Sequence, residues 1–388
     1  MKVLDLSRAL AGPYCTMLLG DMGADVLKLE QPGEGDESRS WGPPFVGEES
    51  SYFLSVNRNK RSLTLNLKDQ QGKEIFHRLV HGADALVENF RVGTMERLGV
   101  GYEALQALNP RLIYASISGF GRSGPYALRA GYDQIAQGMS GMMSITGPDG
   151  GEPTKVGVAI GDIVAGMFAF QGILLALLYR GRSGQGQLVD VSLLDGQIAL
   201  LTYQAGRYLT GGQVPRPAGN NHPLIAPYGA YRAADGYVNI CCGNDALWEK
   251  LCHVLGTAEW LADPRFRSNK DRVKCRMELA QLIDERLAAR PAAYWAEQLS
   301  AAGVPAGPIY TLDQVFSDQQ VLHREMVLTV PHPTAGQVRV TGIPVKLSDS
   351  PGAVRLPPPL LGQHTDQVLS ELGYAQEQIA QLRSGGVV

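Results

Sequence analysis

The segment "KVLDLSRALAGPYCTMLLGDMGADVLKLE", from Lys2 to Glu30, has the pattern of a strand, a helix and a second strand. Its apolar ends, "KVLDL" and "DVLKLE", flank a longer apolar stretch that Gly12 and Pro13 open. Similar strand and helix signals follow in "SLTLNL", "KEIFHRLVHG", "ADALVENF" and "LIYASISGF". Alternation of this kind is typical of parallel sheets with crossover helices. The first third of the chain therefore predicts an α/β fold with a Rossmann-like parallel sheet.

The loops that follow these strands are the expected binding loops. Ligands of open parallel sheets bind outside the carboxyl ends of the strands, which here lead into residues 7–11, 30–35, 67–69 and 89–93. Glu30 stands where a dinucleotide fold places its ribose ligand, but the first turn, "SRALAGPY", lacks the G-x-G-x-x-G pattern. The sequence therefore gives little support for NAD binding.

The domain organisation follows from length and from a change of pattern. A chain of 388 residues exceeds what one hydrophobic core usually organises. Beyond Leu200 the stretch "PRPAGNNHPLIAPYGAYRAADGYVNICCG" is rich in Pro, Gly and Asn, and helical patterns follow from 246 to 302. We expect a large domain over residues 1–205, a linker with a smaller α/β domain over 206–325, and a segment 326–388 that returns to the large domain.

The amino-acid composition of the chain excludes several classes of function. With 44% hydrophobic residues, 19% charged residues and a formal net charge of -3, the chain is neither disordered nor a cationic binder of nucleic acid. Its five cysteines are odd in number and show no C-x-x-C spacing, so neither a disulfide framework nor a zinc site is indicated. The start "MKVLDLSRAL" has no pattern of an export signal. A cytoplasmic location is expected.

The segment "VGVAIGDIVAGMFAFQGILLALLYR", residues 156–180, places one carboxylate, Asp162, at the start of a long apolar run. Gly166, Gln171 and Gly172 interrupt the run, which favours a buried helix over a membrane span. Asp at the start of a helix is a common N-cap. From this stretch alone, Asp162 is therefore a candidate N-cap of the helix.

Several segments, in order, resemble the class III CoA-transferases, the family of formyl-CoA and carnitine CoA-transferases. They are "LDLSRALAGPYCTMLLGDMGADVLKLEQPGEGD", "NRNKRSLTLNLK", "VENFRVGTMERLG", "AGYDQIAQGMSG", "VGVAIGDIVAG", "GRSGQGQLVDVSLLD" and "PPPLLGQHT". In that family the Asp before the apolar helix is the nucleophile, and the matching residue is Asp162. The resemblance implies attack on an acyl-CoA thioester, a mixed aspartyl anhydride, and release of CoA thiolate. It also implies a homodimer of two interlocked chains.

The resemblance also implies where CoA binds. Carried over by position, the contacts are Leu10, Ala11, Gln31, Leu65, Lys68, Asn89, Phe90, Arg97 and Tyr132. Lys68 and Arg97 suit phosphate oxygens, although a solvated surface charge is the alternative for both. Gln31 stands where relatives often carry Arg, and Arg39 is expected to compensate. CoA and acyl-CoA are substrates here, and no cofactor is expected to stay bound.

Tyr132 separates two related activities. The α-methylacyl-CoA racemases resemble this fold but carry "GHD" where this chain has "AGYD". Racemisation needs two bases, and Tyr is a poor base near neutral pH. Tyr132 therefore favours CoA transfer. Asp133 matches an acidic position that supports the transferase site, with a helix cap as the alternative.

The stretch "SRSWGPPFVGEESSYFLSVNRNKRS" most resembles transferases acting on dicarboxylates such as itaconate, glutarate or hydroxymethylglutarate, with succinyl-CoA as donor. A distal carboxylate needs a cationic or hydrogen-bonding partner. The candidates for this acyl pocket are Arg39, Trp41, Arg129 and His222. A metal at His222 is not expected, because no second ligand stands at metal spacing. A racemase-like isomerase and a nucleotide-binding protein without acyl chemistry remain the alternatives. No nucleic acid or membrane partner is expected.

Overall fold

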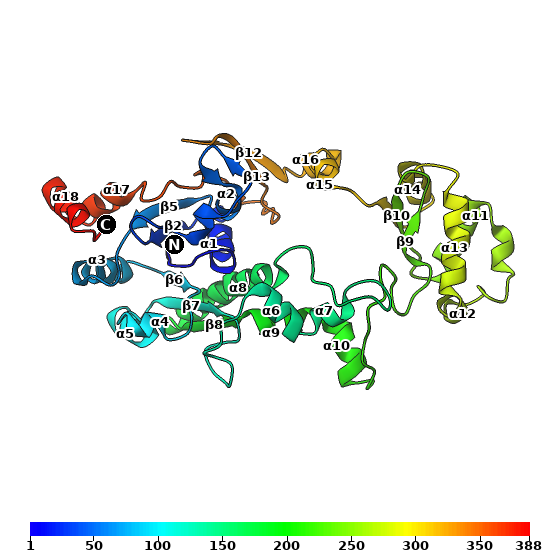
Figure 1. The fold of residues 1–388 in the computed structure, drawn as a ribbon, viewed down its shortest axis with the longest axis horizontal. Helices are drawn as coiled ribbons and strands as arrows, with labels where there is room; N and C mark the ends of the chain where they lie inside the picture. The colour runs from blue at the N-terminus through cyan, green and yellow to red at the C-terminus, as the bar shows by residue number, and fades with distance from the viewer. The chain divides into compact units, whose positions relative to one another are not determined.

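The computed structural model describes residues 1–388, which form two compact units. The first unit comprises Met1–Met143, Lys155–Gln213 and Gln320–Val388 (Figure 1). The second comprises Ser144–Thr154 and Val214–Gln319. The boundaries expected at 205 and 325 thus lie at 213 and 319, and the short segment 144–154 groups with the second unit.

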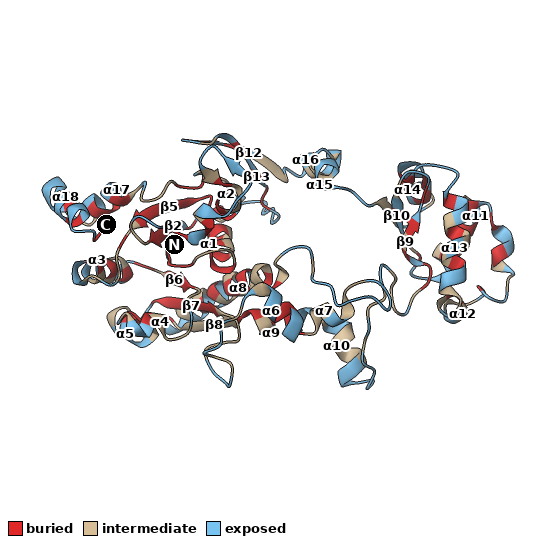
Figure 2. Ribbon diagram, viewed as in Figure 1, coloured by how far each residue is buried: buried red, intermediate tan, exposed pale blue.

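A six-stranded parallel sheet forms the centre of the first unit, with the strand order β5-β2-β1-β6-β7-β8. Its strands are β1 (Lys2–Asp5), β2 (Asp25–Glu30), β5 (Lys60–Thr64), β6 (Ala85–Glu88), β7 (Ile113–Ser118) and β8 (Leu188–Ser192). Most of their residues are buried, because both faces of the sheet are covered (Figure 2). The predicted α/β fold with a parallel sheet is confirmed.

Each face of the sheet has its own apolar core. On one face α1 (Ala11–Asp21) and α8 (Ile160–Ser183) pack on strand residues such as Val3, Val26 and Val87. On the other face lie α3 (Gln70–His81), α5 (Tyr102–Leu108), α17 (Thr365–Glu371) and α18 (Gln376–Ser384). Consecutive strand residues alternate between these two cores, as the pleat requires.

Helix α8 is only partly buried, which corrects the expected buried helix. Its small residues face the sheet, and Gly166 lets α8 approach α1 closely, since a Cβ there would lie 2.6 Å from the Ala11 carbonyl oxygen. The opposite face exposes Met167, Leu175 and Leu178. By length and composition α8 could cross a membrane, but its packing against the sheet is that of a core helix.

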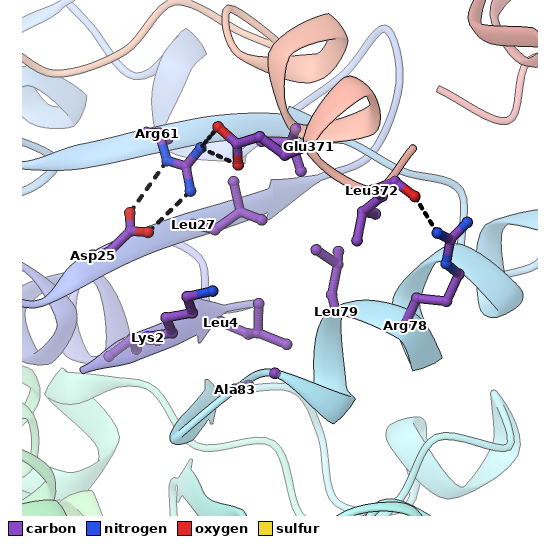
Figure 3. Close-up of a pocket in the computed structure, with 13 residues that line it drawn as sticks. Lys2, Leu4, Asp25, Leu27, Arg61, Arg78, Leu79, Ala83, Glu371 and Leu372 are labelled. Carbon is purple, nitrogen blue, oxygen red and sulfur yellow. Dashed lines mark hydrogen bonds and ion pairs between the residues drawn. The ribbon is translucent and has the colours of Figure 1, made fainter. Parts of the chain in front are cut away.

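The C-terminal segment completes the first unit. Strands β12 (Val327–His332) and β13 (Gly336–Thr341) form a hairpin whose valines pack with Leu54 of α2 (Ser51–Val56). After this hairpin, the chain reaches α17, where Glu371 pairs with Arg61, the second residue of β5. Arg61 also pairs with Asp25 of β2 (Figure 3). These ion pairs hold α17 close to the amino-terminal ends of β2 and β5.

Short elements connect these parts of the first unit. They are a 3-10 turn η1 (Glu37–Ser40), β3 (Phe45–Val46), β4 (Glu49–Ser50), α4 (Thr94–Arg97), α6 (Asp133–Met139), α7 (Met142–Ile145), α9 (Leu193–Leu200), α10 (Thr202–Leu209) and α16 (Gln319–His323). Two of them, α7 and α16, lie across the boundaries of the first unit with the second unit.

The second unit has a three-stranded antiparallel sheet of order β11-β10-β9. Its elements are β9 (Tyr228–Arg232), β10 (Tyr237–Cys241), α11 (Asp245–Leu255), η2 (Ala258–Leu261), α12 (Asn269–Lys274), α13 (Arg276–Leu287), α14 (Ala292–Ala301), β11 (Ala306–Pro308) and α15 (Leu312–Val315). Its core contains Trp248, Trp260 and Trp295, and is separate from the cores of the first unit.

Candidate active site

A pocket of about 400 Å³ opens at the carboxyl edge of the parallel sheet. Residues that follow β1, β6 and β8, together with the end of β7, supply much of its wall, as ligand sites of such sheets require. Eight of the predicted site residues line it: Leu10, Ala11, Trp41, Asn89, Phe90, Arg129, Tyr132 and Asp162. All belong to the first unit.

Asp162 is the third residue of α8, not its N-cap. The cap position is Ala159, whose own side chain makes no capping hydrogen bond. Burial, with a smaller contribution from the negative charge of Asp133, raises the pKa of Asp162 to about 7. A carboxylate that ionises near neutral pH in a partly dry pocket is more basic, and a stronger nucleophile, than an exposed one. The cap-only interpretation of Asp162 is therefore not supported by the helix geometry.

Asp133 holds the start of α8 in place. Its carboxylate accepts hydrogen bonds from the backbone N–H of Gly161, at 2.8 Å, and from the side-chain amide of Gln137, at 2.8 Å. Asp133 is itself the first residue of α6, so it caps a neighbouring helix and not its own. Gly161 is required for this close approach, because a Cβ there would lie 2.3 Å from the Gln197 amide nitrogen.

Tyr52 is a pocket residue that the sequence did not single out. It lies on α2, and its ring packs edge-to-face on Trp41 at a centroid distance of 4.9 Å. Burial, followed by the negative charges of Asp162, Asp36 and Asp133, raises the pKa of Tyr52 to about 12. The phenol therefore stays protonated and can donate a hydrogen bond inside the pocket. Its position in the dicarboxylate-like stretch was the available signal.

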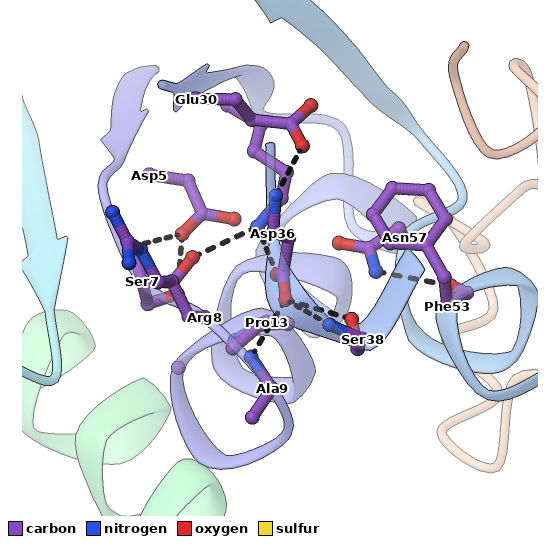
Figure 4. Close-up of polar contacts among 12 residues, drawn as sticks. Asp5, Ser7, Arg8, Ala9, Pro13, Glu30, Asp36, Ser38, Phe53 and Asn57 are labelled. Atoms are coloured by element: carbon purple, nitrogen blue, oxygen red, sulfur yellow. Dashed lines mark hydrogen bonds and ion pairs between the residues drawn. The ribbon is translucent and has the colours of Figure 1, made fainter. Parts of the chain in front are cut away.

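A buried ion cluster supports the pocket loop after β1 (Figure 4). Asp36 accepts hydrogen bonds from the Ala9 N–H at 3.1 Å and from Ser38, and it pairs with Lys28 at 2.8 Å. Burial opposes its ionisation, but Lys28 and Ser38 hold the pKa of Asp36 well below its usual range. Lys28 also donates to the Ser7 carbonyl oxygen at 2.8 Å. These bonds hold Ala9 in a left-handed conformation, with φ of 62°.

Four residues carried over as CoA contacts lie outside this pocket. They are Gln31, Leu65, Lys68 and Arg97. Leu65 is buried, and its backbone N–H donates to the Glu30 carbonyl oxygen at 2.7 Å. Lys68 and Arg97 are exposed. The pantetheine arm of CoA is long enough for the molecule to extend beyond the pocket. Contacts between CoA and these four residues therefore stay a prediction.

Arg39 is already engaged within the protein. Its guanidinium forms two hydrogen bonds with Glu30, at 2.8 and 2.7 Å, and also donates to the Pro359 carbonyl oxygen. It lies over the Phe53 ring and does not line the pocket. Arg39 thus anchors β2 to the C-terminal segment. This arrangement differs from the expected free cation that compensates for Gln31 or binds a distal carboxylate.

Of the remaining predicted residues, Arg129 and Tyr132 line the pocket, and His222 lies in the second unit. Arg129 lines the pocket, is exposed, and lies over the Tyr126 ring. Tyr132 is 76% exposed at the pocket edge. His222 belongs to the second unit, where its ring packs near Tyr228 and its Nδ1 accepts the Leu224 N–H.

A second pocket, of about 170 Å³, lies at the opposite, amino-terminal edge of the sheet (Figure 3). Leu4, Leu27 and Leu79 form part of its wall, and the Arg61 ion pairs border it. It contains none of the predicted site residues. The structure has no cluster of three or more His, Cys, Asp or Glu side chains suited to a metal ion.

The parallel sheet, the pocket at its carboxyl edge and the buried carboxylate on an apolar helix define an α/β enzyme equipped for group transfer. The family model described as CoA-transferase family III matches residues 1–365. The chain therefore belongs to CoA-transferase family III, whose members use CoA thioesters as substrates, and it is a CoA-transferase.

Individual relatives agree with this assignment. The chain is 45% identical over 389 residues to succinyl-CoA:glutarate CoA-transferase of Mus musculus, covering all of this chain and 89% of the mouse protein. It is 44% identical over 363 residues to acetyl-CoA:oxalate CoA-transferase of Acetobacter aceti, covering 92% of each. A CAIB/BAIF family protein from Brucella suis has a similar structure, with a TM-score of 0.87 and 42% identity over 96% of this chain and 98% of that one. The mouse and Acetobacter relatives are named for dicarboxylate acceptors, glutarate and oxalate.

Proposed function

We propose that this enzyme moves CoA from succinyl-CoA to a dicarboxylic acid of the glutarate, itaconate or hydroxymethylglutarate type, with Asp162 as nucleophile. The observation that supports this most is the position of Asp162, a carboxylate with raised pKa in the pocket at the carboxyl edge of the sheet. The dicarboxylate acceptors named for relatives support the substrate class.

The proposed chemistry conserves the energy of the thioester. A carboxylate oxygen of Asp162 attacks the thioester carbonyl carbon, the C–S bond breaks, and a mixed anhydride and CoA thiolate result. The thiolate then attacks the aspartyl carbonyl, which releases the donor acid and leaves CoA on Asp162 as a thioester. The acceptor carboxylate repeats the two steps in reverse order and leaves as its CoA ester, and Asp162 is regenerated.

The environment of Asp162 suits these intermediates. Anhydrides hydrolyse readily, and the apolar residues at the start of α8 limit the access of water. The protonated phenol of Tyr52 can donate to an oxyanion formed in the same pocket. Neither the carboxylate of Asp162 nor the phenol of Tyr52 needs a metal ion for this chemistry.

The substrate proposal is tested with a panel of acceptors at constant succinyl-CoA. Glutarate, itaconate, hydroxymethylglutarate and oxalate are compared with monocarboxylates and half-methyl esters of equal size, and product CoA esters are identified by mass. A charged hydrogen bond to the distal carboxylate contributes about 1.5–3 kcal/mol, which corresponds to an about 10- to 100-fold preference. Equal efficiency with the half-esters would refute the dicarboxylate assignment and leave the transferase assignment intact.

We also propose that the enzyme works as a homodimer. Helix α10 exposes Tyr208 and Leu209, and the exposed side of α8 carries Leu174, Leu175, Leu178 and Tyr179, which follow one another at helical spacing. Contiguous apolar surface of this kind favours burial in an assembly. Sedimentation equilibrium tests this, and Leu175→Lys with Leu178→Lys is expected to shift the enzyme toward monomer.

A further inference from the structure

One cation in the pocket, Arg8, takes no part in the chemistry proposed for Asp162 and Tyr52. Arg8 follows β1 and lines the same pocket as Asp162, and sequence reasoning did not select it. Its role concerns the substrate class of the proposed function and rests on that function.

The backbone of Arg8 is fixed from both sides. Its N–H donates to the Asn89 side-chain oxygen at 2.8 Å, and its carbonyl oxygen accepts from the Asn89 side-chain nitrogen at 2.8 Å. The next residue, Ala9, is held by Asp36 in the left-handed conformation described above. The Arg8 side chain therefore starts from a rigid position, and these bonds do not depend on the side chain itself.

The guanidinium group of Arg8 has no anionic partner in the protein. It lies over the Phe90 ring, 5.3 Å from the centroid, and makes no ion pair or side-chain hydrogen bond. Most other buried or half-buried arginines of the first unit are paired with a carboxylate, for example Arg39 with Glu30, Arg58 with Asp21, and Arg122 with Glu96. Arg207, outside the pocket, donates instead to the side-chain oxygen of Gln204. The carboxylates that line the pocket, Glu37 and Asp162, do not pair with Arg8.

Two other arginines, Arg91 and Arg129, line the pocket, and both are exposed. Arg8 is half-buried, so solvent screens its charge less than theirs. Arginine presents a planar fork that binds a carboxylate through two parallel hydrogen bonds. An unpaired, partly desolvated arginine that starts from a fixed backbone and lines the same pocket as Asp162 has the features of an anion-binding group.

We propose that Arg8 binds the distal carboxylate of the dicarboxylic acyl group while its thioester carbonyl faces Asp162. CoA phosphates are the other anions that could meet this guanidinium, and free CoA distinguishes the two, because it carries the phosphates and no acyl group. Arg8 then determines specificity for dicarboxylates, and Arg39 supports the fold.

The test compares the wild-type enzyme with Arg8→Gln, Arg8→Lys and Arg129→Gln, and with Arg324→Gln as a control on an exposed arginine outside the pocket. Two quantities are measured: kcat/KM for succinyl-CoA with a dicarboxylate acceptor, and the Kd of free CoA by calorimetry. The melting temperature of each variant shows that the fold is retained.

The expected result is an about 10- to 100-fold fall in kcat/KM for Arg8→Gln, a smaller fall for Arg8→Lys, and a Kd of CoA unchanged within about twofold. A parallel rise in the Kd of CoA would assign Arg8 to the phosphates and overturn the proposal. Unchanged kcat/KM in Arg8→Gln, or a larger loss in Arg129→Gln, would also overturn it. In each of these cases a preserved wild-type preference for dicarboxylates leaves the proposed function standing, whereas a wild-type enzyme without that preference removes the proposed function itself.

Discussion

The carboxylate of Asp133 accepts the backbone N–H of Gly161 at 2.8 Å, directly before the nucleophile candidate Asp162. One side chain thus fixes the first turn of α8 and places a negative charge near Asp162. Fixing the turn favours a constant position of Asp162, and the charge adds to the effect of burial on its pKa. This hydrogen bond links the first turns of α6 and α8, which together position Asp162.

The first prediction concerns pH. Because burial and Asp133 raise the pKa of Asp162 to about 7, the carboxyl group is mostly neutral below that pH and unable to attack. We expect kcat/KM for succinyl-CoA to rise about tenfold per pH unit below pH 7 and to level off above it. A flat profile between pH 5 and 8 would contradict this.

Asp133→Asn isolates the electrostatic part of that effect. Asn keeps an oxygen that can accept the Gly161 N–H and loses the negative charge, so the acid limb should move to lower pH. The shift should be partial, because burial is the larger cause. Asp349→Asn, at an exposed position outside the pocket, is the matched control and should leave the profile unchanged.

The second prediction concerns stability. The folded pKa of Asp162, about 7, exceeds the ordinary value of 3.8, so ionisation disfavours the folded state increasingly from pH 4 to 7 and fully above pH 7. A difference of about 3 pH units corresponds to at most about 4 kcal/mol. Asp162→Asn should therefore melt at a higher temperature than wild type at pH 8, with the difference shrinking toward pH 4. Thermal melts at both pH values measure this difference in melting temperature, and a constant difference would argue against the raised pKa.

Much of the fold was predictable from local patterns. The alternation of apolar strands and helices from Lys2 onward is a local property, so the parallel sheet could be inferred before its strand order was known. Asp162 stood out because a single carboxylate interrupts an apolar run. Its place as the third residue of α8 could not be read from the local pattern, because the start of this helix is bonded to Asp133, which is 29 positions away from Asp162.

Contacts between distant segments explain the rest. Arg39 resembled a free cation in sequence, but its partners are Glu30 and Pro359, the latter 320 residues away. Arg8 was overlooked because its significance depends on Asn89, which joins it only through the pairing of β1 with β6. Contacts of this kind, between segments far apart in the chain, cannot be inferred from the local sequence pattern.

The third prediction concerns Tyr52. Its phenol stays protonated at pH 8 because burial and nearby carboxylates raise its pKa to about 12. Removing the hydroxyl in Tyr52→Phe should lower kcat about tenfold or more and change KM less, as expected for a donor that acts mainly on the developing oxyanion. Tyr237→Phe, on β10 of the second unit, is the control. An equal effect on KM and none on kcat would assign Tyr52 to substrate binding only.

The fourth prediction separates transfer from racemisation. Tyr132 occupies the position where a racemase would need a base, and it is largely exposed at the pocket edge. We therefore expect no deuterium from solvent at the α-carbon of a 2-methylacyl-CoA incubated with the enzyme. Mass spectrometry of the recovered thioester measures this, and time-dependent incorporation would support the isomerase alternative.

The nucleophilic role of Asp162 is tested by trapping its acylated or CoA-bearing carboxylate. Enzyme is mixed with succinyl-CoA, quenched with hydroxylamine and digested, and the peptide containing Asp162 is analysed by mass spectrometry. We expect an aspartyl hydroxamate at Asp162 in the wild-type enzyme that depends on succinyl-CoA. The hydroxamate should be absent from folded Asp162→Asn, which should also lack turnover. A hydroxamate at another residue, or undiminished turnover by Asp162→Asn, would contradict it.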